Sequence, residues 1–175
     1  MAISDSPART GRLVGFAGWS GSGKTTLMIG VIPVLTRRGL TVSTVKHAHH
    51  AFDIDRPGKD SWLHREAGAT EVMVASANRF ALIHELRGAG EPGLEELLSR
   101  MTPTDIVLVE GFRHGLHPKI EIFRPELDKP ALHPNDPMIV AIASPKPPDG
   151  SALPWLPLDD AEAVAEFIAT SALFD

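Results

Sequence analysis

The chain of 175 residues contains neither cysteine nor glutamine. Without cysteine it cannot form a disulfide or a thiolate-bound zinc or iron–sulfur site, and this composition is compatible with a reducing cytosol. The first ten residues have no apolar core of a signal peptide, and no apolar run approaches the roughly 20 residues that cross a bilayer. We therefore expect a cytoplasmic protein with no membrane partner.

The charge and length of the chain narrow the class further. A net charge of -5 gives no general attraction to nucleic acid, so we expect no nucleic-acid partner and look for ligands at local sites. A hydrophobic content of 43% over this length can bury one substantial core. We predict a single domain over residues 12–175, preceded by a short extension over residues 1–11.

A phosphate-binding motif is the strongest signal. The run from Gly18 to Thr25 reads Gly-Trp-Ser-Gly-Ser-Gly-Lys-Thr and fits G-x-x-x-x-G-K-[ST] at every fixed position. An apolar strand is expected before it at 13–17, and a helix with apolar residues at helical spacing after it at 25–38. Loop amides and the helix N-terminus then form a hollow for a polyphosphate. The candidate nucleotide-binding residues are Gly18, Ser20, Gly21, Ser22, Gly23, Lys24, Thr25 and Thr26.

An acid placed at the end of an apolar strand completes this expectation. Residues 106–109 are continuously apolar, as in a parallel strand covered on both faces, and Glu110 follows them. Lys24 is expected to reach the β- and γ-phosphates, while Thr25 and Glu110 bind Mg²⁺. Asp105 begins the same strand and lies roughly 15 Å away, too far to share that role. A solvated loop acid is the alternative for Glu110.

Apolar patterning predicts the fold class. We expect an α/β protein with the three-layer P-loop NTPase fold and a mostly parallel central sheet, with the ligand at the carboxyl ends of the strands. The proline-rich segment 144–157 is expected to lack regular structure, and Asp159 is expected to cap the last helix with Glu162 in a capping box. Further strands are expected at 40–45, 71–75, 80–86, 119–123 and 138–143, with helices at 60–67 and after Pro92.

A polar segment rich in histidine and aspartate, 46–58, looks like a working loop. Its histidines and aspartates permit a transition-metal site or contact with a substrate or partner, and we favour the second interpretation. Scattered cations, among them Arg113 and Arg124, are compatible with an anionic ligand. The candidates for cofactor or partner contact are His47, His49, His50, Asp53, Lys59, Arg65 and Lys119.

These motifs together resemble the molybdopterin-guanine dinucleotide biosynthesis protein B (MobB) family. The likeness runs from about Leu13 to Ala143. Beyond the phosphate loop it rests on Val45-Lys46-His47 with His49-His50, Asp53-Ile54-Asp55, Pro57-Gly58-Lys59-Asp60-Ser61, Arg65-Glu66-Ala67-Gly68-Ala69, Val109-Glu110-Gly111-Phe112, and Pro118-Lys119-Ile120-Glu121 with Arg124. The combination Lys-His-x-His-His with Asp-Ile-Asp-x-Pro-Gly-Lys-Asp-Ser is far more particular than the phosphate loop.

The resemblance implies a GTP- and Mg²⁺-binding accessory protein of molybdenum cofactor biosynthesis. Such a protein assists the MobA guanylyltransferase, which attaches GMP to molybdopterin or Mo-molybdopterin, and it is a homodimer with weak GTPase activity. Two alternatives use the same loop: a metallochaperone GTPase and a small-molecule kinase.

Hydrolysis is expected to be slow. The chain has no glutamine to orient water, and no arginine finger can be identified from spacing. Lys24 is the main candidate for catalysis, while Asp55, Asp60 and His47 are weaker candidates for orienting water. No Asn-Lys-x-Asp signature for guanine occurs either, although Ser144-Pro145-Lys146 with Asp149 occupies a comparable place.

Overall fold

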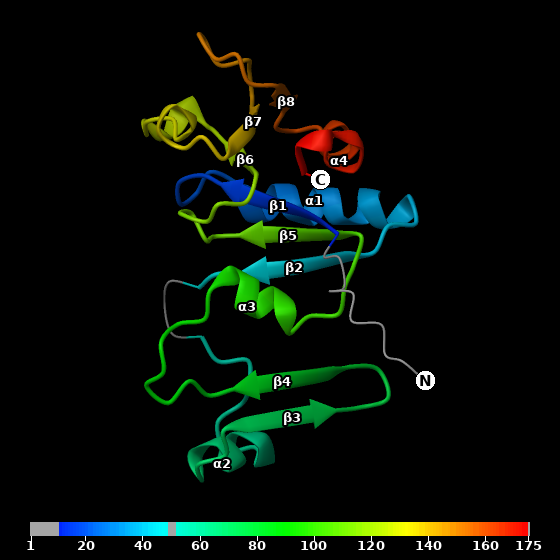
Figure 1. Cartoon of the computed structure of the whole chain (residues 1–175), viewed down its shortest axis with the longest axis vertical. Helices are drawn as coiled ribbons and strands as arrows, with labels where there is room; N and C mark the ends of the chain where they lie inside the picture. The colour runs from blue at the N-terminus through cyan, green and yellow to red at the C-terminus, as the bar shows by residue number, and fades with distance from the viewer. Residues whose placement is uncertain (1–10, 49–51, 175) are drawn as a thin grey trace, which may run out of the picture. The chain divides into compact units, whose positions relative to one another are not determined.

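A computed structural model describes residues 11–48 and 52–174, in two compact units (Figure 1). The part of the chain up to His47 and from Leu98 onward forms the first, which we call the sheet unit. Ala48–Leu97 form the second, the inserted unit. The single domain expected over residues 12–175 stays a prediction.

The sheet unit is built on six parallel strands in the order β2-β5-β1-β6-β7-β8. The first strand, β1, lies between β5 and β6, so the chain after β1 emerges in the middle of the carboxyl edge. This confirms the expected α/β class with a parallel sheet. The strands are β1 (Arg12–Ala17), β2 (Val42–Lys46), β5 (Ile106–Glu110), β6 (Lys119–Ile122), β7 (Ile139–Ser144) and β8 (Trp155–Pro157).

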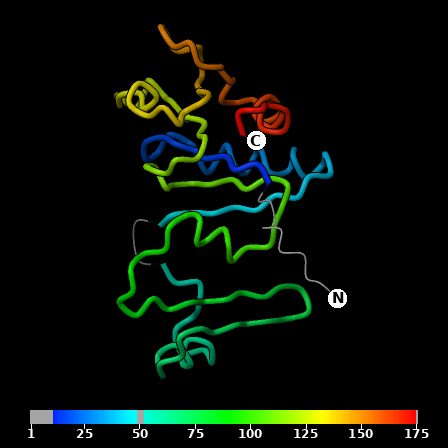
Figure 2. The backbone as a smooth tube through the Cα atoms, viewed as in Figure 1, coloured from blue at the N-terminus to red at the C-terminus, as the bar shows by residue number. Residues whose placement is uncertain are grey.

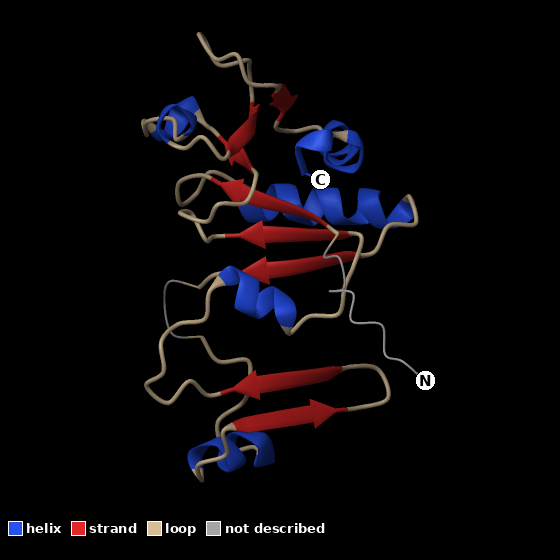
Figure 3. Ribbon diagram, viewed as in Figure 1, coloured by secondary structure: helices blue, strands red, loops and turns tan. Residues whose placement is uncertain are grey.

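Two helices cover one face of this sheet. Helix α1 (Lys24–Arg37) and helix α4 (Ala161–Thr170) pack on each other and on the strands (Figure 3). They enclose the main apolar core with a short 3₁₀ turn, η3 (Ala172–Phe174). Because side chains alternate along a strand, Ile120 and Ile122 of β6 point into this core.

The other face of β6 is polar. Lys119 and Glu121 alternate with the two isoleucines, and each is only 1% exposed. The connection from β6 to β7 carries two 3₁₀ turns, η1 (Pro125–Leu127) and η2 (His133–Asn135), and folds back over these side chains. Glu121 accepts hydrogen bonds from the amides of Leu132 (2.6 Å) and His133 (3.0 Å). An irregular segment is thus held by one buried carboxylate, which satisfies backbone donors that have no strand partner.

The inserted unit contains an antiparallel pair, β3 (Glu71–Ala75) and β4 (Phe80–His84), and a short helix, α2 (Asp60–Glu66). Helix α3 (Leu94–Ser99) lies where the chain passes back to the sheet unit. The chain path in Figure 2 leaves the sheet after β2 and returns to it as β5. The inserted unit therefore lies within the crossover between two neighbouring strands.

Two local expectations were wrong. Trp155–Pro157 form the edge strand β8, although the prolines around it favoured irregular structure. Proline is tolerated on an edge strand because one side of that strand needs no ladder hydrogen bond. The last helix is capped by Asp160, whose side chain accepts from the Ala163 amide at 2.9 Å, and not by Asp159. Glu162 therefore cannot occupy the third helical position that a capping box requires.

Across residues 11–48 and 52–174, no helix combines the length and the apolar content that crossing a membrane requires.

Candidate functional site

The phosphate loop connects the end of β1 to the start of α1. A Cβ atom at Gly18 would lie 2.6 Å from the Ser22 hydroxyl and 2.7 Å from the Ile122 carbonyl oxygen, so only glycine fits there. Gly23 adopts φ of 99°, in the left-handed region that favours glycine. The fixed glycines of the motif are therefore required by the fold of the loop itself. The Ser22 hydroxyl is buried and has no hydrogen-bond partner within the described residues.

The motif lysine bonds to its own loop. Lys24 Nζ donates to the carbonyl oxygens of Gly18 (2.9 Å) and Trp19 (3.0 Å). Partial burial lowers the pKa of Lys24, Glu110 opposes that effect, and Lys46 adds to it. The ammonium group is thus held at the hollow by weak neutral acceptors, which a phosphate group can replace with charge-assisted bonds.

The structure brings together the two residues expected to bind Mg²⁺. The register of β1 and β5 sets Phe16 beside Glu110, so the acid lies at the same sheet edge as the loop. Thr25 Oγ1 donates to both carboxylate oxygens of Glu110, at 2.9 and 3.1 Å. Lys46 Nζ lies 3.7 Å from Glu110 Oε2. A hydroxyl and a carboxylate in contact form part of an all-oxygen donor set, which is the chemistry that Mg²⁺ prefers.

The chain turns sharply after Glu110. Gly111 and Phe112 have φ values of 97° and 47°, and a positive φ is uncommon for a residue as bulky as phenylalanine. The ring of His47, at the end of β2, lies 4.9 Å from the ring of Phe112. His47 therefore packs against Phe112, which follows Glu110 by two residues at the carboxyl end of β5.

The sequence placed Arg124 among scattered cations and in one block of the family resemblance, without a role at the phosphate loop. In the structure its Nε donates to the Ser22 carbonyl oxygen at 2.9 Å, against the outside of the phosphate loop. The signal that could have identified it is its position: it follows β6, and β6 is the strand beside β1.

The aspartates of the inserted unit form a network around one arginine. Arg65, whose side chain is 12% exposed, pairs with Asp53 (2.9 Å), Asp55 (3.3 Å) and Glu85 (2.7 Å). Asp55 also accepts from the Ser61 hydroxyl at 2.8 Å. Through these bonds, Asp53, Asp55 and Arg65 hold the inserted unit together.

The remaining candidates have less defined surroundings. Lys59 and Asp60 are exposed at the start of α2, while His49 and His50 lie outside the described residues. Lys119, a candidate for cofactor or partner contact, is buried in the sheet unit. Within residues 11–48 and 52–174 no three histidine, cysteine, aspartate or glutamate side chains cluster in a way that could hold a metal ion.

A parallel sheet that carries this loop after β1 and an acid at the end of β5 defines the P-loop class of α/β proteins. The model of the family described as "MobB: Molybdopterin guanine dinucleotide synthesis protein B" matches residues 13–145. The chain belongs to the MobB family.

Similar proteins agree over most of the chain. The molybdopterin-guanine dinucleotide biosynthesis adapter protein of Escherichia coli K12 is 42% identical over 159 residues, covering 89% of this chain and 90% of that one. The Haemophilus influenzae protein with the same description is 42% identical over 135 residues, covering 75% and 74%. A crystal structure of molybdopterin-guanine biosynthesis protein B (mobB) superposes with a TM-score of 0.71 at 29% identity, covering 90% of this chain and 98% of that one. These matches put the chain among adapter proteins of molybdopterin-guanine dinucleotide biosynthesis.

Proposed function

We propose that this protein binds GTP with Mg²⁺ and assists the MobA guanylyltransferase in attaching GMP to molybdopterin. The observation that carries the proposal is the contact between Thr25 and Glu110 beside Lys24. It joins a phosphate-binding lysine, a hydroxyl and a carboxylate at one sheet edge, which is the set of groups that a magnesium nucleotide needs.

Each group has a role in this proposal. Lys24 leaves the carbonyl oxygens of Gly18 and Trp19 and binds the β- and γ-phosphates. Thr25 and Glu110 would hold the Mg²⁺ ion, which neutralises charge on the same phosphates. Lys46, 3.7 Å from Glu110, is the cation beside that carboxylate, and a bound metal ion would take its place.

Turnover by the isolated protein is slow in this proposal. The chain has no glutamine to orient water. Asp55, one of the weaker candidates for that task, is already bonded to Arg65 and Ser61. An adapter that holds GTP for a partner needs no fast hydrolysis, so the proposal treats GTPase activity as secondary.

Preference for guanine is proposed for the segment after β7. Strand β7 ends at Ser144, whose hydroxyl donates to the Lys146 carbonyl oxygen at 2.7 Å. The indole of Trp155 on β8 donates to the Ser144 carbonyl oxygen at 3.2 Å. These bonds order Ser144-Pro145-Lys146 at the carboxyl edge, where α/β sheets bind ligands. We expect tighter binding of GTP than ATP, and equal affinities in a Mg²⁺-containing titration would overturn this.

A homodimer is also proposed. In the β3–β4 pair, Met73 lies opposite Leu82 and Ala75 opposite Phe80, so Met73, Leu82 and Phe80 share one face. Met73 is 62% and Phe80 70% exposed. An exposed apolar strip on an antiparallel pair supports association of two copies. Sedimentation equilibrium should find dimers, and Phe80→Lys should shift them toward monomers.

Reconstituted cofactor guanylation tests the main proposal. MobA, molybdenum-loaded molybdopterin and limiting GTP are combined with this protein or with Lys24→Ala. We expect stimulation by the unmodified protein and little by the variant. The exposed Arg79→Ala variant, which also removes one positive charge, should stimulate fully. Absence of stimulation would reject the adapter role, and equal stimulation by Lys24→Ala would remove nucleotide binding from it.

A further inference from the structure

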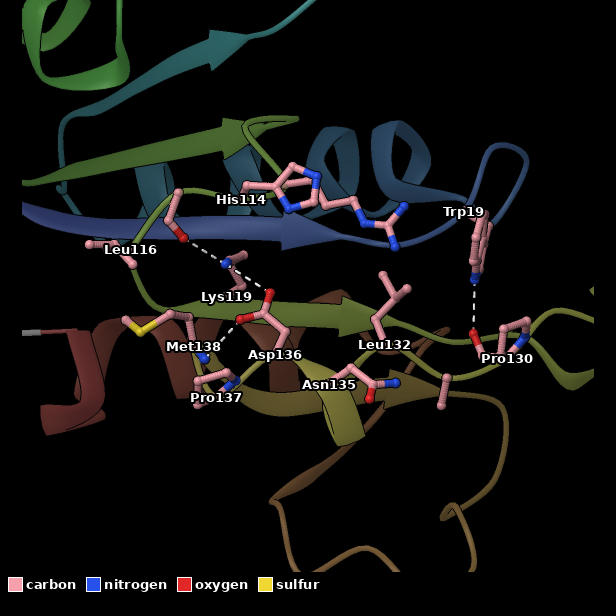
Figure 4. Close-up of a pocket in the computed structure, with 13 residues that line it drawn as sticks. Trp19, His114, Leu116, Lys119, Pro130, Leu132, Asn135, Asp136, Pro137 and Met138 are labelled. Atoms are coloured by element: carbon pink, nitrogen blue, oxygen red, sulfur yellow. Dashed lines mark hydrogen bonds and ion pairs between the residues drawn. The ribbon is translucent and has the colours of Figure 1, made fainter.

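A second cavity lies beside the phosphate loop in the sheet unit. It has a volume of about 330 Å³ and lies between the loop, the segment 113–119 and the connection from β6 to β7 (Figure 4). Trp19 forms one wall, Leu132 and Met138 add apolar surface, and Lys119 and Asp136 lie at the base. Ligand pockets run from about 300 to 1,000 Å³, so this one suits a group the size of a fused bicyclic ring.

The base of the cavity holds a buried ion pair in which one hydrogen-bond donor is not used. Lys119 Nζ donates to the Gly115 carbonyl oxygen at 2.7 Å and to Asp136 Oδ2 at 2.9 Å. An ammonium group has three donors, and the third N–H of Lys119 has no acceptor among the described residues. Lys119 is 1% exposed but lines the cavity, so an acceptor can approach this donor only from the cavity side.

The wall of the cavity is aromatic and positively charged. The guanidinium carbon of Arg113 lies 5.0 Å from the centre of the Trp19 ring, and Lys129 Nζ lies 5.9 Å from it. Neither cation pairs with a carboxylate in the part of the chain that the structure describes. The indole N–H of Trp19 donates to the Pro130 carbonyl oxygen at 2.8 Å, which fixes the ring. Among the lining residues, Arg113 and Lys119 face one carboxylate, Asp136, so the site favours an anion.

We propose that this cavity binds a small planar anion, a pterin bearing an acidic group. The ring stacks on Trp19, a ring oxygen or nitrogen accepts from Lys119, and the acidic group lies near Arg113. The lining of the cavity itself indicates a ligand that is planar, carries a hydrogen-bond acceptor and is negatively charged. The choice of a pterin rests on the proposed function. In that setting the site holds the acceptor substrate next to the phosphate loop, because Trp19 belongs to both.

Trp19 takes part in both the phosphate loop and the cavity, but through different atoms. Its carbonyl oxygen accepts from Lys24 on the phosphate side, and its ring lines the cavity. Removal of the Lys24 side chain therefore damages nucleotide binding without removing any cavity wall, whereas truncation of Trp19 or Arg113 damages the cavity.

The test is a calorimetric titration of the whole protein with pterin-6-carboxylate. We expect saturable binding that Trp19→Leu weakens about tenfold through loss of stacking. Arg113→Ala should also weaken binding and reduce its salt dependence, because one of the cations of the site is removed. Trp62→Leu and Arg79→Ala, both in the inserted unit, are the matched controls and should bind as the unmodified protein does. Far-ultraviolet circular dichroism checks that each variant is folded.

Several outcomes would overturn the proposal. The first is the absence of saturable binding. The second is an affinity in both Trp19→Leu and Arg113→Ala equal to that of the unmodified protein. The third is loss of pterin binding in Lys24→Ala, which would put the probe in the phosphate loop. GMP provides a second arm: Trp19-dependent binding of GMP to Lys24→Ala that is tighter than pterin binding would assign the cavity to a nucleotide. If GTP binding and MobA stimulation succeed without pterin binding, this inference alone fails. If the pterin binds but MobA is not stimulated, the adapter role alone fails.

Discussion

Thr25 and Glu110 are separated by 85 positions in the chain, yet the threonine hydroxyl lies 2.9 and 3.1 Å from the two carboxylate oxygens of the glutamate. The parallel register of β1 and β5 creates this contact, because it sets the start of α1 and the last residue of β5 at one edge. A hydrogen bond now joins two groups that a bound metal ion would separate and use as ligands.

Glu110→Gln should therefore remove most of the gain in GTP affinity that Mg²⁺ provides. An amide cannot supply the negative charge, although it can still accept from Thr25. We expect a loss of about tenfold or more in affinity with Mg²⁺ present, and little change in its absence. Titration calorimetry with and without EDTA measures both. Glu126→Gln, an exposed acid on η1, should behave as wild type; an equal loss in both variants would argue against a metal role for Glu110.

Asp160→Ala should lower the free energy of unfolding by about 1 kcal/mol, because the Ala163 amide loses its acceptor. Asp159→Ala is the matched neighbour, and it should change stability by less. Urea denaturation followed by circular dichroism compares the two. The reverse order would restore Asp159 as the cap.

His117 should make stability depend on pH. Burial lowers its pKa from 6.5, Lys119 lowers it further, and Asp136 opposes both. Neither ring nitrogen has a hydrogen-bond partner among the described residues. The folded protein therefore favours neutral His117, while the unfolded chain takes up a proton near pH 6.5. Stability is fully present above that pH and is lost as the pH falls toward the depressed folded pKa.

The check compares urea midpoints of the unmodified protein and His117→Leu between pH 8 and pH 5. The unmodified protein should lose more stability on acidification than the variant does. Gly15 and Gly115 pack against the imidazole, so the variant can differ in absolute stability, and the difference between the two pH profiles is the informative quantity. Parallel profiles would contradict the prediction.

Arg65→Met should loosen the inserted unit. The substitution leaves Asp53, Asp55 and Glu85 without their shared cation, and like charges then repel. Hydrogen exchange should accelerate in Ala48–Leu97 and remain unchanged in the six-stranded sheet. Arg79→Met, whose side chain is exposed, is the control. Faster exchange in both units would contradict a local role.

Acid should weaken the same network. The hydrogen bond from Arg65, aided by the Asp55 amide, lowers the pKa of Asp53 below 3.8. The stabilisation is therefore present above pH 3.8 and is lost as the pH falls through the lower folded value. Protection factors in the inserted unit, which are corrected for the intrinsic pH dependence of amide exchange, should fall with acid over this range, and they should fall less in Arg65→Met.

The sequence predicted those parts of the fold that depend on local patterns. The phosphate loop and the apolar strand before Glu110 combine a spacing motif with a continuous hydrophobic run, and both signals lie within a few residues. Strand β8 was missed because its pairing with β7 depends on residues more than ten positions away, and local proline content argued against it. The cap was misplaced by one residue because two adjacent aspartates are equal candidates until the helix start is known.

The residues of the candidate site also include some that the sequence could predict and some that it could not. Thr25 and Glu110 could be paired from sequence because strand-end acids follow a general rule. Lys119 was a candidate for cofactor or partner contact, but a lysine that alternates with isoleucines gives no sign in the sequence of its ion pair with Asp136. The cavity at Trp19 was equally hidden, because its walls come from three separate segments that only the folded sheet brings together.

The place of the inserted unit in the chain order affects how the protein can evolve. Strands β2 and β5 are neighbours in the sheet, so residues 48–97 interrupt a single crossover and contribute no strand to the six-stranded ladder. Sequence change in that segment, or even its replacement by a shorter connection, alters no pairing in the six-stranded sheet. The two units can therefore evolve under different constraints: the sheet unit must keep the geometry of its phosphate loop, whereas the inserted unit must keep only its own strand pair.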